Sequence, residues 1–347
     1  MSESTLAVVG SYTQEGGDGL STYRVTGGSL TSCDSAYEEN PSFVDSHPTE
    51  DIFLAVNERE DGSAVSYRVD RRDGSLHRLD STETGGAGPC HVAVGPRGEY
   101  AVVSHYDGGS VGLLSVAPDG SLAGPLHVRE HEGTGPNTDR QTAPHPHSAW
   151  FVTDSLVYVP DLGADRVVVY ELDRNAERLD PLPDASFDCP PGSGPRHIAF
   201  HPSEPVGYLV NELRPSLSVL DLSEPERPAI DQTHSTLPAA ADPTETIAAD
   251  VHVHPAGTHV TVSNRGHDSL ATFAAEQSPL DLVRTDVTET GGTCPRNFAI
   301  HPDGTRIYVC HLQSDDITPF TVDPKTGGPD RAETRIKVGA PACLHFM

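Results

Sequence analysis

A sevenfold repeat constrains the fold of this chain more than any other feature of its sequence. Six stretches spaced about 50 residues apart share one apolar pattern, and a shorter seventh copy follows them. The copies are NPSFVDSHP (40–48), GPCHVAVGP (88–96), HPHSAWFV (145–152), GPRHIAFHP (194–202), AADVHVHP (248–255), CPRNFAIHP (294–302) and GAPACLHF (339–346). After each of the first six comes a second apolar run, such as VGYLVNEL, and then a third, such as SLSVLDL.

These runs have the alternating, β-branched character of short strands, and the 32 glycines and 30 prolines suit many tight turns. Repeats of four short strands at this spacing are typical of a β-propeller. The first residues, LAVVGSYT, match a second run, and the last repeat matches a first run. We therefore expect an all-β, seven-bladed propeller, a single domain over residues 1–347. Its C-terminal strand should join the N-terminal blade and close the ring without a free edge.

The chain is strongly acidic, with a formal net charge of −28 and only two lysines, Lys325 and Lys337. The electrostatic field of such a negatively charged protein repels nucleic acid and anionic membranes, so we expect neither as a partner. The acidic residues are scattered rather than gathered in tails. This favours the solvated surface of a protein from a high-salt cytoplasm, where self-repulsion is screened. The alternative is an ordinary acidic cytosolic protein.

Targeting and redox signals are absent from the sequence itself. The start, MSESTLAVVGSYT, lacks a basic region followed by an apolar stretch, and no run approaches 18 apolar residues. The expected location is therefore the cytoplasm. The six cysteines form no C-x-x-C pair, which favours buried free thiols.

Strand direction predicts which side chains share the mouth of the central channel. In a propeller the first strand of each blade lines the channel and the second runs antiparallel to it, so the start of the first strand and the end of the second lie on one face. This places a polar set around a single opening: Asn57, Glu58, His145, His147, Arg196, Asn211, Glu212, Asn264, Arg265 and Arg296. The His-Pro turns, with His47, His201, His254 and His301, fall on the opposite face, where we expect a structural role.

Arginine is the informative residue type in this set. Arg196, Arg265 and Arg296 come from three adjacent repeats and repel one another unless negative charge lies among them. Glu212 supplies part of that charge, and a carboxylate or phosphate ligand is expected to supply the rest through bidentate contacts. The alternative is a structural ion-pair network between blades.

The longest connection, residues 129–148, enters the fourth blade on the same face, and its composition suits an ordered functional loop. His145 and His147 are two residues apart and would share one face of a strand. Two histidines without an obvious third ligand make a weak metal signal, so we expect no metal. A histidine that carries a proton to or from the substrate is favoured instead.

Several of these motifs together resemble the seven-bladed propeller lactonases, which include propeller-type 6-phosphogluconolactonases and carboxymuconate-lactonizing cyclases. The resemblance spans essentially the whole chain and lies in QTAPHPHSAWF, VPDLGADRVVVYEL, GSGPRHIAFHP, YLVNEL, VSNRGHDSL and CPRNFAIHPDG. It implies catalytic roles for His147 (or His145), Arg196, Glu212 and Arg265. These residues belong to the set that strand direction gathers at the mouth.

The resemblance implies a lactone hydrolase acting on an anionic sugar lactone, with 6-phosphogluconolactone as the expected substrate, and we expect no cofactor. Either Glu212 or His147 could activate water, and His147 is favoured because neighbouring arginines keep Glu212 weakly basic. Arg196 would stabilise the oxyanion, while Arg265 and Arg296 would bind a phosphate or carboxylate. Substrate-binding roles are expected for His145, Asn57, Glu58, Asn211 and Asn264. Two alternatives stay open: a muconate-type lactonizing isomerase and a non-catalytic binding propeller.

Overall fold

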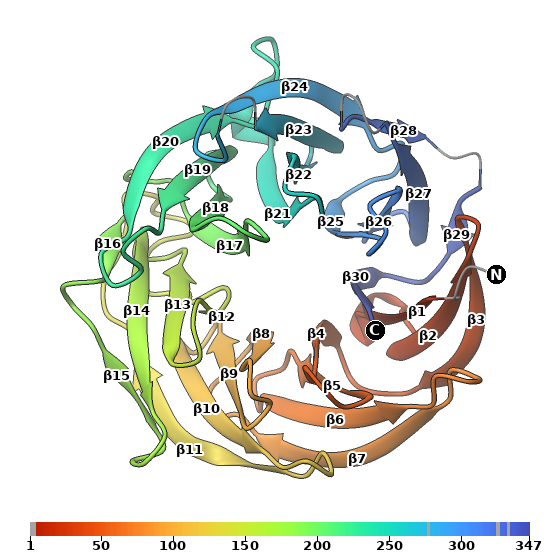
Figure 1. Ribbon diagram of the computed structural model, residues 1–347, viewed down its shortest axis with the longest axis vertical. Coiled ribbons are helices and arrows are strands. Elements are labelled where there is room, and N and C mark those ends of the chain that lie inside the picture. The colour runs from red at the N-terminus through yellow and green to blue at the C-terminus, as the bar shows by residue number, and fades with distance from the viewer. Residues whose placement is uncertain (1–4, 276–277, 324–326, 332–333) are drawn as a thin grey trace.

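The strands of this protein form seven antiparallel sheets arranged as blades around a central axis (Figure 1). The computed structural model describes residues 5–275, 278–323, 327–331 and 334–347. In Figure 1 the first strand of each blade lies nearest the axis and the last lies at the rim. The predicted all-β, seven-bladed architecture is confirmed.

The blades follow one another along the chain, and their strands have the following bounds. Blade 1 contains β30 (Pro341–Phe346), β1 (Thr5–Ser11), β2 (Leu20–Thr26) and β3 (Ser29–Ala36). Blade 2 contains β4 (Pro41–Ser46), β5 (Ile52–Asn57), β6 (Ser63–Val69) and β7 (Leu76–Glu83). Blade 3 contains β8 (Pro89–Val94), β9 (Tyr100–His105), β10 (Ser110–Val116) and β11 (Leu122–Glu130). Blade 4 contains β12 (Trp150–Phe151), β13 (Leu156–Asp161), β14 (Arg166–Asp173), β15 (Arg178–Pro181) and β16 (Phe187–Asp188).

The remaining three blades repeat this arrangement. Blade 5 contains β17 (Pro195–Phe200), β18 (Val206–Asn211), β19 (Ser216–Asp221) and β20 (Ala229–Ser235). Blade 6 contains β21 (Ile247–Val253), β22 (His259–Arg265), β23 (Ser269–Ala275) and β24 (Leu282–Glu289). Blade 7 contains β25 (Pro295–Ile300), β26 (Arg306–His311), β27 (Asp316–Val322), β28 (Pro329–Arg331) and β29 (Ile336–Lys337).

The described residues contain almost no helix. The 3-10 turns η1 (Thr13–Glu15) and η2 (Pro243–Glu245) are the two helical segments among the described residues. In the same residues, no helix has the length and hydropathy needed to cross a bilayer.

The hydrophobic core lies between adjacent blades rather than at one centre. Second strands such as β18 are buried along their whole length, which explains their continuous apolar sequence, whereas the rim strand β20 alternates in exposure. Tyr208 and Val219 of blade 5 pack in one cluster with Val262 and Phe273 of blade 6. Each blade is therefore covered by its neighbours.

The ring is closed by strand pairing between the first and last strands of the described chain. β30 runs antiparallel to β1, with Ala7 opposite Phe346 and Val9 opposite Leu344. The predicted closure is thus confirmed. It leaves blade 1 with four strands like the other simple blades.

The His-Pro turns join neighbouring blades on the face opposite the channel mouth. His201 Nε2 donates to the carbonyl of Gly257 in the next blade at 3.1 Å, and its Nδ1 accepts the backbone N–H of Glu204 at 3.0 Å. His254 Nε2 donates in the same way to Gly304 at 3.0 Å. These contacts support the structural role expected for the turn histidines.

Candidate active site

A β-bulge at the start of the first strand directs one side chain from most blades toward the axis. In blade 5, Pro195 pairs with Asn211 and His197 with Val210, so Arg196 is the extra, unpaired residue between them. A bulge of this kind bends the strand and re-aims a side chain. The same register shift occurs after Pro41, Pro89, Pro295 and Pro341, which makes the equivalent residues Ser42, Cys90, Arg296 and Ala342.

A second repeated position follows the end of each second strand. The backbone N–H of Glu212 donates to the carbonyl of Gly194 at 2.7 Å, across the start of its own blade. Equivalent bonds run from Tyr12 to Ala340, from Glu58 to Asn40 and from Tyr106 to Gly88. In blades 1, 2, 3 and 5 the mouth is therefore built from two positions, one at the bulge and one after the second strand.

Glu212 is the centre of the charged group at this mouth. Its side chain is 2% exposed and its Oε2 forms ion pairs with Arg196 Nε at 3.0 Å and Arg265 Nη2 at 2.8 Å. Arg140 Nη2 donates to Oε1 at 2.8 Å. Three guanidinium groups thus face one carboxylate, which leaves an excess of two positive charges.

The charges of this group follow from their surroundings. Burial alone raises the pKa of Glu212, but Arg265, Arg196 and Arg140 outweigh it and bring the pKa to about 2. Burial, followed by repulsion from Arg265, lowers the pKa of Arg196 to about 10. Both side chains are therefore ionised near neutral pH.

One of the terminal nitrogens of Arg196, Nη2, is free of hydrogen bonds to the described residues. Its Nη1 donates to the carbonyl of Ala249 and lies 3.2 Å from His197 Nε2, whereas Nη2 makes no hydrogen bond to a described residue. The guanidinium is fixed by its Nε and Nη1 contacts. It can present the remaining N–H groups to an anion without moving.

A second charged group lies beside the first and contains Arg296. Arg296 Nη2 donates to the hydroxyl of Tyr12 at 2.7 Å and lies 3.9 Å from Glu58 Oε2, to which Tyr12 also donates at 2.7 Å. Arg196 and Arg296 line the same small cavity of about 10 Å³. The three predicted arginines therefore share the mouth, but Arg296 has partners of its own.

His147 lies between Cys90 and Glu212. Its Nε2 is 4.0 Å from Glu212 Oε2, and Cys90 Sγ is 3.9 Å from its Nδ1. Burial, followed by the positive charge of Arg196, keeps the pKa of His147 well below its usual range, so the ring is neutral near pH 7. A neutral imidazole in this position can accept a proton.

His145 is held against Tyr106 outside any strand. Their rings stack with centroids 4.4 Å apart, and His145 Nδ1 donates to the Tyr106 carbonyl at 2.7 Å. The expectation that His145 and His147 share one face of a strand is wrong. Residues 145–149 are irregular apart from a bridge at Pro146, because Pro144 and Pro146 cannot donate to a strand ladder.

Aromatic rings from four blades pack against one another at the channel, and three of them, from Phe43, His91 and Trp150, line a cavity of about 190 Å³. The ring of His91 lies 4.0 Å from that of Phe43, 4.8 Å from that of Trp150 and 5.5 Å from that of His197, measured between centroids. His197 is fixed by Asp250, whose Oδ1 lies 2.9 Å from its Nδ1. We therefore expect a ligand to reach the charged groups from the mouth side.

The three predicted asparagines bind within and between blades. Asn211 Nδ2 donates to Ser218 Oγ at 2.9 Å, Asn264 Oδ1 accepts from Thr236 Oγ1 at 2.6 Å, and Asn57 Nδ2 donates to the Glu39 carbonyl at 2.9 Å. These contacts stabilise the ends of the second strands. A role for the asparagines in substrate binding stays a prediction.

Residues missed by the sequence analysis complete both charged groups. Arg140 lies within the long loop that was expected to be functional, and it also donates to the Tyr106 hydroxyl at 2.9 Å. Tyr12 lies beyond β1, where no motif drew attention to it. Among the described residues, no group of three or more His, Cys, Asp or Glu side chains is arranged to bind a metal ion.

Comparison with known proteins places this geometry in a family. The family model described as "Lactonase, 7-bladed beta-propeller" matches residues 6–346. A Bacillus subtilis protein named 6-phosphogluconolactonase is 28% identical over 351 residues, with 99% of this chain and 98% of the relative covered. A Formosa agariphila protein of the same name is 27% identical, with 89% and 88% covered.

Solved structures agree with this family comparison. The periplasmic gluconolactonase of Pseudomonas aeruginosa is 31% identical and superposes with a TM-score of 0.92, covering 99% of each chain. A Lactobacillus plantarum protein is 25% identical with a TM-score of 0.90, again over 99% of each chain.

Proposed function

This chain belongs to the seven-bladed β-propeller lactonase family, and we propose that it hydrolyses 6-phosphogluconolactone at the channel mouth. The family resemblance seen in the sequence is confirmed, and the chain is a lactone-hydrolysing enzyme. The phosphorylated substrate is supported by the two relatives named 6-phosphogluconolactonase. The observation that carries the proposal is the excess of positive charge around Glu212 in a chain of net charge −28.

In the proposed mechanism, His147 is the general base. Its Nε2 and the carboxylate of Glu212 are too far apart for a direct hydrogen bond, but a water molecule about 2.8 Å from each would bind both. In the tautomer that carries its proton on Nδ1, Nε2 is free to take a proton from this water. Glu212 is too weak a base for that step, because its pKa is about 2.

The attack forms a bond between water oxygen and the lactone carbonyl carbon, and the carbonyl oxygen becomes an oxyanion beside Arg196. Collapse of this intermediate breaks the bond to the ring oxygen, which receives the proton held by His147. The product is an open-chain hydroxy acid. Glu212 acts as a positioning residue, since it holds Arg196 and Arg265 at 3.0 and 2.8 Å.

The alternatives are less well supported. An isomerase would use the same histidine to move a proton to carbon. A scaffold would not need to bury Arg196 and Arg265 around one carboxylate, which is costly. None of the named relatives reported above is described as either.

The location and surroundings of the enzyme follow from the same proposal. We propose that the enzyme, acting on a phosphorylated sugar lactone, works in the cytoplasm. We take that cytoplasm to be rich in salt because the chain carries 51 acidic and 23 basic residues. Nucleic acid and membranes are not expected partners at this charge.

The decisive experiment measures acid release from phosphorylated and unphosphorylated aldonolactones above the spontaneous rate. We expect wild-type enzyme to act on both and Arg196→Lys to lose about 100-fold in kcat, because lysine cannot keep both fixed contacts and still donate to the oxyanion. Arg227→Lys serves as a control, since Arg227 is exposed in the β19–β20 connection on the opposite face. A normal rate for Arg196→Lys would falsify the assigned role.

A further inference from the structure

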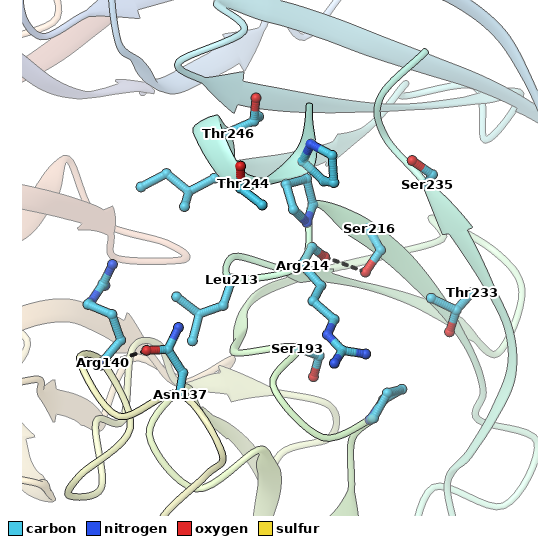
Figure 2. Close-up of a pocket in the computed structure, with 14 residues that line it drawn as sticks. Asn137, Arg140, Ser193, Leu213, Arg214, Ser216, Thr233, Ser235, Thr244 and Thr246 are labelled. Carbon is cyan, nitrogen blue, oxygen red and sulfur yellow. Dashed lines mark hydrogen bonds between the residues drawn. The ribbon is translucent and has the colours of Figure 1, made fainter. Parts of the chain in front are cut away.

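A large pocket opens beside the charged groups, on the same face of blade 5. It has a volume of about 760 Å³, within the range of small-molecule sites. We call it the blade-five pocket. Figure 2 shows the 14 residues that line it, among them Asn137, Arg140, Ser193, Arg214 and Ser216.

The lining of the blade-five pocket contains no acidic residue, which is unusual in this chain. Of 347 residues, 51 are Asp or Glu, yet the 14 lining residues include two arginines and no carboxylate. Two pockets on blade 2 differ in this respect. One contains Glu38, Glu39 and Glu83, and the other Glu50, Asp51 and Asp70. The lining of the blade-five pocket therefore supplies two cations and no anion, and the carboxylates of Asp165 and Asp242 lie behind it, hydrogen-bonded to Ser193 and Thr244.

Arg214 carries the free positive charge of this pocket. It is exposed, and no ion pair joins its guanidinium to a described acidic residue, whereas Arg140 is paired with Glu212. In Figure 2 the Arg214 side chain extends into the pocket on the side of Ser193. Its planar group of N–H donors matches the oxygens of a phosphate.

The neighbouring side chains supply complementary groups. Asn137 uses its Oδ1 to accept the backbone N–H of Arg140 at 3.1 Å, which leaves its Nδ2 without a hydrogen bond to a described residue. The Ser216 hydroxyl donates to the Arg214 carbonyl at 2.7 Å and accepts from Asn211 Nδ2 at 3.1 Å, which leaves one lone pair that can accept a sugar hydroxyl. The pocket thus offers donors for an anion and acceptors for a polyol.

Arg140 joins the blade-five pocket to the reacting group. It lines the pocket and also contacts Glu212 Oε1 at 2.8 Å. Leu213 and Arg214 follow Glu212 directly in the chain, so pocket and carboxylate share one turn. Arg140 therefore contacts both the carboxylate that binds Arg196 and the lining of the blade-five pocket.

We propose that the blade-five pocket binds the phosphate end of the substrate, with Arg214 as the residue that selects phosphorylated over unphosphorylated lactones. This inference rests on the proposed function. The Arg214 guanidinium and the Asn137 amide donate to the phosphate, while the lactone carbonyl lies at Arg196. Arg296, whose Nη2 is bound to Tyr12, is then not needed for the phosphate.

The test compares Arg214→Gln with wild type on 6-phosphogluconolactone and on glucono-lactone at one fixed salt concentration. We expect the ratio of kcat/KM values, phosphorylated over unphosphorylated, to fall about 10-fold or more, mainly through KM, because a hydrogen bond to a charged group is lost. Arg227→Gln makes the same change of charge on the same blade but on the opposite face, and it should keep the wild-type ratio. An unchanged ratio in Arg214→Gln overturns the assignment of the pocket.

A binding measurement separates this inference from the proposed function. Calorimetry with 6-phosphogluconate and with gluconate needs no turnover. If the wild type hydrolyses neither lactone, the proposed function fails. The pocket assignment then requires at least 10-fold weaker binding of 6-phosphogluconate by Arg214→Gln than by wild type. Equal affinity of the two proteins, or equal loss for phosphorylated and unphosphorylated ligands, refutes it.

Discussion

Replacing Glu212 by glutamine should destabilise the protein by an amount that depends on pH in a defined way. Glutamine keeps the shape of the side chain but removes the charge that holds Arg140, Arg196 and Arg265 together. The pKa of Glu212 falls from an ordinary value of 4.5 to about 2 in the folded protein. That shift corresponds to about 3 kcal/mol of stability near neutral pH. The same magnitude is expected when one partner of a buried ion pair is removed.

The pH dependence follows from the direction of the shift. The folded-state pKa of Glu212 lies below its unfolded-state value, so its stabilisation is complete above about pH 4.5 and is lost as the pH falls toward 2. The difference between wild type and Glu212→Gln should therefore be constant at neutral pH and shrink below pH 4.5. At neutral pH a chain of 347 residues should melt about 4 °C lower in the variant.

Scanning calorimetry at a series of pH values measures this difference. Glu204→Gln is the matched control, because Glu204 is exposed on the opposite face of the same blade and should change the melting temperature by less than about 1 °C. The reasoning is refuted if Glu212→Gln melts with the wild type at pH 7, or if the difference persists unchanged at pH 3. Either result would mean that the carboxylate does not hold the arginines together.

Two further predictions concern pH and salt. Burial and the charge of Arg196 lower the pKa of His147, so kcat/KM for lactone hydrolysis should stay level from pH 8 to below pH 6 and decline only at more acidic pH. A decline centred at or above pH 6.5 would exclude His147 as the base. Raising KCl from 0.1 to 2 M should increase the melting temperature, because screening reduces the repulsion within a chain of charge −28. A constant or falling melting temperature would argue against adaptation to high salt.

The seven-bladed ring could be predicted from the sequence because the same pattern of apolar runs recurs in every repeat. Each copy specifies the same strand direction, so the positions of Arg196, Glu212 and Arg265 on one face followed from counting runs. The β-bulge was not predicted, since a pattern of period two has no place for an extra residue. The structure shows which sequence feature marks the bulge. It is the proline at the start of the first strand, and the residue after it, as in Pro195-Arg196 and Pro295-Arg296, is the bulged one.

The repeats did not allow us to predict which charged side chains pair with one another at the mouth. Arg140 lies in an irregular loop without a counterpart in other blades, so nothing in the sequence placed it on Glu212. Arg296 was expected to join the other arginines around one ligand, but Tyr12 and Glu58 already bind it. Such choices depend on distances of a few ångströms between blades, which strand direction alone does not determine.

The pairing of β30 with β1 has a consequence for the order of folding. Residue 7 pairs with residue 346, so roughly 340 residues separate the two halves of that contact. At a synthesis rate of about 5–20 residues per second, β30 is synthesised on the order of 20 to 70 s after β1. Throughout that interval, one edge of blade 1 is unpaired and open to strands from neighbouring nascent chains. The last blade to be completed is therefore the first to be made, and translation speed sets how long the growing ring is exposed to misassembly.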